Sequence, residues 1–184
     1  LLVFNSNGPY KNQVAKEVKL IDIQAPRVRH GFFKVRKAIK EQAPTHILSV
    51  IRDGNILLGL ALLFNRASIL IYREANTLDE LKRKNFFKRF ISLIKMKLGY
   101  LRADLIIANS KDTRLDLFAN KIKKPDRIVV ISNPVLPLNF TFLKSQAVAY
   151  EWVDSKYKII LNIGRFHKQK NQLILIDAFR AVVD

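Results

Sequence analysis

The sequence predicts an α/β protein with a Rossmann-like parallel sheet, followed by the start of a second unit of the same class. Short apolar runs alternate with longer stretches whose apolar residues recur at helical spacing. The short runs are continuous in Ile, Leu and Val, as in "ADLIIAN" (103–109), which is typical of parallel strands covered on both faces. The order strand, helix, strand implies right-handed crossovers and a doubly wound arrangement.

Each element of the first unit has its own pattern. Residues 31–42 place apolar side chains on one face of a helix, whereas 55–65 is apolar nearly all round and has to be buried. Ser110 precedes another helix as an N-cap, with Asp112 in its first turn. The predicted strands are 18–23, 46–50 (buried), 68–73, 103–109 and 126–132. The predicted helices are 31–42, 55–65, 78–100 and 110–121.

The pattern of apolar residues changes after the fifth predicted strand. Residues 133–157 contain two prolines and show no periodicity, which is typical of a linker between domains. We expect a first domain over 1–132, incomplete at its N-terminus, and the start of a second over 158–184, with a buried strand at 158–164 and a helix at 170–184. One strand and one helix cannot close a core, so the chain is expected to be a fragment of a two-domain protein.

The composition is strongly basic. Of 184 residues, 33 are Lys or Arg and 15 are Asp or Glu, which gives a formal net charge of +18. This charge indicates a polyanionic partner (nucleic acid, an anionic membrane surface or phosphates), and a lysine-rich surface that maintains solubility is the alternative. The absence of cysteine excludes disulfides and thiolate metal sites, and three scattered histidines argue against zinc. No apolar run approaches the roughly 18 residues that a membrane-spanning helix needs.

The stretch "LNIGRFHKQKN" (161–171) concentrates positive charge on a turn between a predicted strand and a predicted helix. Gly164 permits a tight turn and close approach of a ligand. Arg165 offers a planar fork for phosphate oxygens, and Lys170 adds a mobile point charge near the start of a helix. These features predict a diphosphate site, with a solvated basic loop as the alternative.

Two stretches of the sequence, taken together, resemble those of a known family. "ADLIIANSKDTRLDLFANKIKKPDRIVVISNPV" and the later "KIILNIGRFHKQKNQLILIDAF" resemble the retaining glycosyltransferases of family 4, which have the GT-B fold. The resemblance runs in order over roughly the whole chain and is strongest over 101–183. It implies that the second domain binds a nucleotide-diphosphate sugar and the first binds the acceptor. It places Arg165 and Lys170 on the donor diphosphate, Gly164 beside it, and Asn133–Pro134 at the crossover between domains.

The resemblance also draws attention to the end of the strand 68–73. Many family members have a histidine here, whereas this chain reads "REAN", closer to the Ser-Glu-Arg-like sequence of relatives that extend lipid-linked oligosaccharides. Glu74 is expected to position an acceptor hydroxyl or act on its proton as the catalytic residue, with a salt bridge to Arg73 or to the nearby basic helix as the alternative. Arg73 and Asn76 are expected on the acceptor side, although Asn76 could instead cap the next helix.

Parts of the family pattern are missing. The opening strand and glycine-rich loop are expected before Leu1, and the Glu-x7-Glu motif that holds the donor is expected beyond Asp184. The chain is therefore expected to be inactive alone.

Residues 78–102 combine lysine and arginine with phenylalanine and aliphatic side chains. A helix with a cationic and an apolar face is typical of the membrane interface, so we expect contact with an anionic membrane surface. The alternative is that the apolar side packs on the sheet and the lysines face water.

The resulting expectation is a glycosyltransferase that transfers a sugar, UDP-linked in most of the resembling group, to a glycan or polyprenyl-linked acceptor with retention. No metal or other cofactor is expected, because no Asp-x-Asp cluster follows a strand and the basic turn can neutralise the leaving diphosphate. The expected location is cytoplasmic, peripheral on the inner face of the membrane. A basic nucleic-acid-binding module and a GT-B sugar-nucleotide epimerase are the alternatives; specific nucleic-acid binding is not expected, because no reading motif is present.

Overall fold

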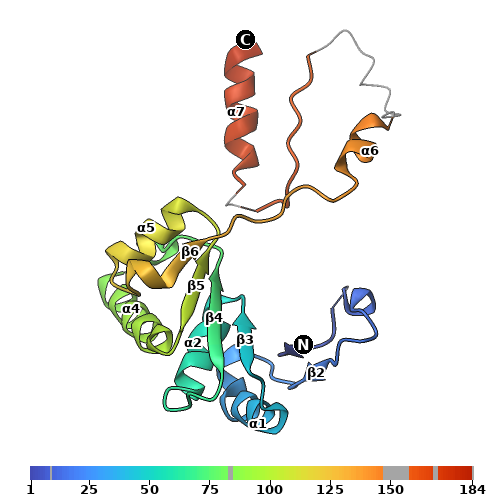
Figure 1. Cartoon of the computed structure of the whole chain (residues 1–184). Helices are drawn as coiled ribbons and strands as arrows, with labels where there is room; N and C mark the ends of the chain where they lie inside the picture. Colours follow the sequence, from blue (N-terminus) through green and yellow to red (C-terminus); the bar gives the residue numbers. More distant parts are fainter. Residues whose placement is uncertain (9, 83–84, 147–157, 168–169, 184) are drawn as a thin grey trace. The chain divides into compact units, whose positions relative to one another are not determined.

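The computed structural model of this chain describes residues 1–8, 10–82, 85–146, 158–167 and 170–183. The chain forms two compact units, Leu1–Pro134 and Val135–Asp184. The first contains a four-stranded sheet, a separate two-stranded sheet and the helices that pack on them (Figure 1). The boundaries of the expected domains stay a prediction.

The main sheet is parallel, with strand order β3-β4-β5-β6. Its strands are β3 (His46–Ser49), β4 (Ile69–Glu74), β5 (Leu105–Ala108) and β6 (Ile128–Val130). The smaller sheet pairs β1 (Leu2–Val3) with β2 (Ile21–Asp22), also in parallel. The predicted α/β class with parallel strands is confirmed.

The helices of the first unit connect these strands. They are α1 (Phe32–Gln42), α2 (Arg52–Ala61), α3 (Asp79–Lys82), α4 (Phe86–Leu101) and α5 (Lys111–Ala119), with 3-10 turns at Lys11–Gln13, Val28–Gly31 and Pro125–Arg127. The predicted cap of α5 is confirmed, because the Ser110 hydroxyl accepts a hydrogen bond from the Thr113 N–H at 3.1 Å.

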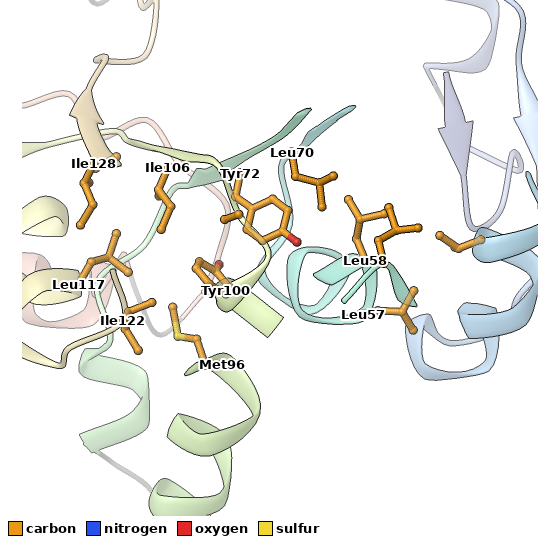
Figure 2. Packing of buried hydrophobic residues seen from close by; sticks show 14 of the residues in the cluster. Leu57, Leu58, Leu70, Tyr72, Met96, Tyr100, Ile106, Leu117, Ile122 and Ile128 are labelled. Carbon is orange, nitrogen blue, oxygen red and sulfur yellow. The ribbon is translucent and has the colours of Figure 1, made fainter. Parts of the chain in front are cut away.

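The core lies on one face of the main sheet. Side chains from α2, α4 and α5 meet Tyr72, Ile106 and Ile128 of three adjacent strands in a single buried cluster (Figure 2). Ile71 and Ile107, which point to the opposite face, are half-buried. The strand order explains this, since right-handed crossovers that always advance to the next strand place successive helices on the same side. The helices described in the first unit therefore do not meet the expectation of a sheet covered on both faces.

Two other element predictions in the first unit are wrong. The single helix predicted over 78–100 is divided into α3 and α4, because Asn85 has an extended backbone and its side chain accepts from the Lys88 N–H at 3.0 Å, which starts a new helix. The strand at 46–50 was predicted to be buried, but β3 alternates exposed and half-buried residues because it lies at the edge of its sheet.

The second unit contains α6 (Phe140–Ser145) and α7 (Gln172–Val183). The helix predicted at 170–184 thus corresponds to α7. The buried strand predicted at 158–164 is not formed: these residues are exposed and without regular structure. A strand needs a neighbour for its backbone hydrogen bonds, and none of the described residues of this unit pairs with the segment.

Candidate functional site

A pocket of about 570 Å³ lies in the first unit, where β3 and β4 end and α2 begins. The carboxyl edge of a parallel sheet is the usual place for a ligand, because the loops that follow the strands converge there. Apolar side chains of α2 and α4, among them Ile56 and Met96, form part of its wall. The polar lining residues are Arg52, Asp53, Glu74, Asn76, Ser92 and Lys95. The charged lining residues are two cations, Arg52 and Lys95, and two carboxylates, Asp53 and Glu74, so the lining has no excess of either charge.

Glu74 is the most buried ionisable group of the pocket, with 2% of its surface exposed. One carboxylate oxygen accepts from Arg52, from Nη2 at 2.8 Å and from Nε at 3.2 Å. The other accepts from the Tyr100 hydroxyl at 2.5 Å. The salt bridge that was the alternative for Glu74 is formed with Arg52 of α2, and among the described residues not with Arg73 or the basic helix.

Tyr100 is fully buried, and its ring packs edge-on against that of Tyr72, 5.1 Å between centroids. Burial, and next the charge of Glu74, raise the pKa of Tyr100 far above its ordinary value. The hydroxyl therefore keeps its proton and donates to the carboxylate at any physiological pH. The side-chain amide of Asn55 lies 3.1 Å from the same hydroxyl and extends the network into α2.

Arg73 and Glu74 point to opposite faces of the sheet, as consecutive residues of a strand must. Glu74 and Asn76 line the pocket, whereas Arg73 is half-buried on the other face and donates to the Asn133 side chain. The structure thus brings two of the three predicted residues of this segment together. Any contact of the three with an acceptor stays a prediction.

The predicted diphosphate residues lie on one turn of the second unit. The aliphatic part of Lys170 lies over Gly164, where a Cβ atom would be 3.4 Å from Lys170 Cγ. The Gln172 side chain closes the turn by donating to the Arg165 carbonyl at 2.9 Å. Gln172 is also the first residue of α7. Gly164, Arg165 and Lys170 are exposed, and their role in binding a donor stays a prediction.

The outward face of α4 is apolar. Phe87, Phe90, Ile94, Leu98 and Leu101 form an exposed stripe along the helix, each between 40% and 69% exposed. Met96, Gly99 and Tyr100 form the opposite, buried face. Lys95 and Lys97 border the stripe, and α4 contains no acidic residue. No helix among the described residues is long and apolar enough to cross a membrane.

Sequence reasoning missed four polar residues of the pocket: Ser92 and the three charged residues Arg52, Asp53 and Lys95. The sequence did contain a signal for Arg52 and Asp53, because "RDGN" (52–55) is separated by one residue from the predicted strand 46–50 and is therefore expected near the carboxyl edge of the sheet. For Lys95 the sequence contained no such signal beyond its position in a basic helix. Within the described residues, no three His, Asp or Glu side chains are placed to share a metal ion. The expectation of a reaction without metal stays a prediction.

Comparison with known proteins gives two relatives. The chain is 30% identical over 125 residues, 68% of its length, to N-acetylgalactosamine-N,N'-diacetylbacillosaminyl-diphospho-undecaprenol 4-alpha-N-acetylgalactosaminyltransferase of Campylobacter jejuni. It is 23% identical over 168 residues, 83% of its length, to an uncharacterized glycosyltransferase of Methanocaldococcus jannaschii. The chain is related to glycosyltransferases. It spans 33% and 39% of the length of these relatives. No family model matches it.

Proposed function

We propose that the whole protein is a retaining glycosyltransferase of family 4 with GT-B architecture, which transfers a hexose from a UDP-sugar to a glycan or lipid-linked acceptor. The observation that carries this proposal is the pocket at the carboxyl edge of β3 and β4, in a chain similar to a transferase whose acceptor is a diphospho-undecaprenol-linked sugar.

The pocket is proposed to hold the acceptor sugar. Asn76 is proposed to bind one of its hydroxyl groups, and the apolar wall to contact the C–H face of the ring. Glu74 is proposed as the catalytic carboxylate. Three donors occupy its two oxygens, which have about four lone-pair sites, so one site is left for an acceptor hydroxyl. Arg73, at the same sheet edge but on the other face, is proposed to contact a part of the acceptor outside the pocket.

The turn of the second unit is proposed to bind the donor diphosphate. Arg165 and Lys170 supply two positive charges beside a glycine, and they would stabilise the negative charge of the leaving diphosphate without a metal ion. The concentration of positive charge on this short turn before a helix supports the proposal.

The stripe of α4 is proposed to lie at the cytoplasmic surface of the membrane. Its exposed phenylalanines and aliphatic side chains would enter the interface, and the lysines beside them would meet anionic headgroups. An enzyme held in this way reaches an acceptor whose lipid tail stays in the bilayer.

The test is a transfer assay with the intact gene product, a panel of labelled UDP-sugars and a polyprenyl-diphosphate-linked sugar. Label is expected to move into the lipid fraction with the anomeric configuration of the donor. Glu74→Gln is expected to lower kcat about 100-fold or more, as loss of a general base does. Hydrolysis of the donor without transfer, or no reaction with any donor, would contradict the proposal.

A further inference from the structure

The segment that follows β4 is held in place from two sides. On one side is Arg52 of α2, whose Nη2 donates to the carbonyl oxygens of Asn76 at 2.9 Å and Thr77 at 3.1 Å. The guanidinium is itself fixed by its two hydrogen bonds to Glu74. One arginine therefore connects the start of α2, the end of β4 and the loop beyond it.

On the other side is Asn109, at the end of β5. Its backbone N–H donates to the carbonyl of Glu74 at 3.2 Å, and its side-chain amide donates to the carbonyl of Ala75 at 2.8 Å. The N–H of Leu78 donates to the carboxylate of Asp116 on α5. Four successive carbonyls of this segment, from Glu74 to Thr77, thus have a donor within the protein, which favours a single conformation of the loop.

We propose that Arg52 is a positioning residue of the acceptor pocket, which fixes the loop 75–77 so that Asn76 faces the acceptor sugar before the sugar binds. This inference rests on the proposed function. A loop ordered in advance does not have to be ordered by the ligand, so its conformational cost is absent from the binding free energy. Arg52 acts through the groups that it holds, which are the backbone of the loop and the Glu74 carboxylate.

The arrangement needs an arginine. A planar guanidinium can serve Glu74 and two carbonyls at once, whereas the ammonium group of a lysine is a point charge at the end of a flexible chain. Arg52→Lys keeps the charge beside Glu74 and removes the fixed fork. We expect it to raise the acceptor KM about tenfold or more, with the donor KM changed less than about twofold. A fall in kcat is expected as well, because the guanidinium that holds the Glu74 carboxylate is lost.

Arg102→Lys is the matched control. Arg102 is a buried arginine that likewise binds two loop carbonyls, those of Asn65 and Ser68, at the opposite edge of the sheet. It is expected to lower the midpoint of thermal unfolding at least as much as Arg52→Lys, with the acceptor KM unchanged. A general loss of stability is thereby separated from a loss of loop order.

Hydrogen exchange of the segment 75–78 in the intact protein gives a readout that needs no activity. Exchange is expected to accelerate in Arg52→Lys and to stay at the wild-type rate in Arg102→Lys. Unchanged exchange in Arg52→Lys would overturn the inference, and so would faster exchange with an unchanged acceptor KM. If the wild type transfers no sugar, the proposed function fails, and exchange alone then decides whether Arg52 orders the loop.

Discussion

Gly59 of α2 and Gly99 of α4 lie backbone against backbone. A Cβ atom on Gly59 would be 1.7 Å from the Gly99 carbonyl oxygen, and one on Gly99 would be 2.6 Å from Ile56 Cα. Two helices can approach this closely only where each has a glycine, which lacks a side chain, at the crossing point. It fixes the neighbouring Tyr100, whose hydroxyl reaches Glu74 in the pocket.

The crossing makes Gly59→Ala a strongly destabilising substitution. The added methyl group has to move backbone atoms of α4, so the free energy of unfolding is expected to fall by about 3 kcal/mol. Gly54→Ala, in the same helix, is the control, because its Cβ would be 3.6 Å from Ser49 Oγ, an ordinary contact. It is expected to be neutral or stabilising by up to about 1 kcal/mol. Urea unfolding of both variants checks this, and equal losses would contradict the packing argument.

Asp104 gives a prediction about pH. Burial acts to raise the pKa of its carboxyl group, but the hydrogen bonds from the Leu70 N–H (2.8 Å) and Arg102 (2.7 Å), with the Arg102 charge, hold that pKa below its ordinary value of 3.8. A carboxyl group with a lowered pKa in the folded state adds stability above the unfolded-state pKa, and this stability is lost as the pH falls through the folded-state value.

Asp104→Asn is therefore expected to be less stable than the wild type near pH 7, and this difference is expected to shrink as the pH falls below about 4. Thermal unfolding of both proteins from pH 7 to pH 3 measures it. A difference that stays constant over this range would mean that the charge of Asp104 does not contribute.

Local chemistry in this sequence was a reliable guide to local structure. The apolar runs gave the strands of the main sheet, and Ser110 caps its helix as expected. The alternation of side chains along a strand also implies that Arg73 and Glu74 of β4 face opposite sides of the sheet, and this could have been predicted from the sequence. The turn with Gly164 and Lys170 likewise follows from neighbours in sequence.

The contacts that build the pocket depend on strand order and helix crossing, which no local pattern contains. Arg52 and Glu74 are 22 residues apart and meet because β3 and β4 are adjacent. Tyr100 and Glu74 are 26 residues apart and meet because α4 crosses α2 so closely. The edge position of β3 also follows from the order β3-β4-β5-β6, and so does the placement of the first unit's described helices on one face of the sheet.

The stripe on α4 predicts how membrane binding can be removed. Phe90→Ser with Leu98→Ser takes two large apolar side chains from the stripe and leaves every lysine in place. Each side chain that enters the interface contributes on the order of 1 kcal/mol, so binding to anionic vesicles is expected to weaken about tenfold or more. Sedimentation with phosphatidylglycerol vesicles at low salt measures this change.

Phe33→Ser is the control for that experiment, because Phe33 is even more exposed than Phe90 and Leu98 but lies on α1. It is expected to leave vesicle binding unchanged. Lys97→Gln, at the border of the stripe, is expected to weaken binding by a smaller factor that disappears at high salt. If the wild type fails to sediment with anionic vesicles at low salt, the stripe has another role.

Lys170 tests the turn of the second unit separately from the pocket of the first. Its side chain lies over Gly164 and is exposed, so Lys170→Ala removes one positive charge without opening a core. If the turn binds the donor diphosphate, the intact protein is expected to lose about 100-fold in kcat/KM for the nucleotide sugar, because a cation that stabilises the leaving group is missing. Lys144, on α6, is also exposed, so Lys144→Ala removes the same charge and is expected to leave these kinetics unchanged. An equal effect of the two substitutions would point to the general charge of the chain and not to a site at Gly164, and no effect of either would rule out Lys170 as a donor ligand.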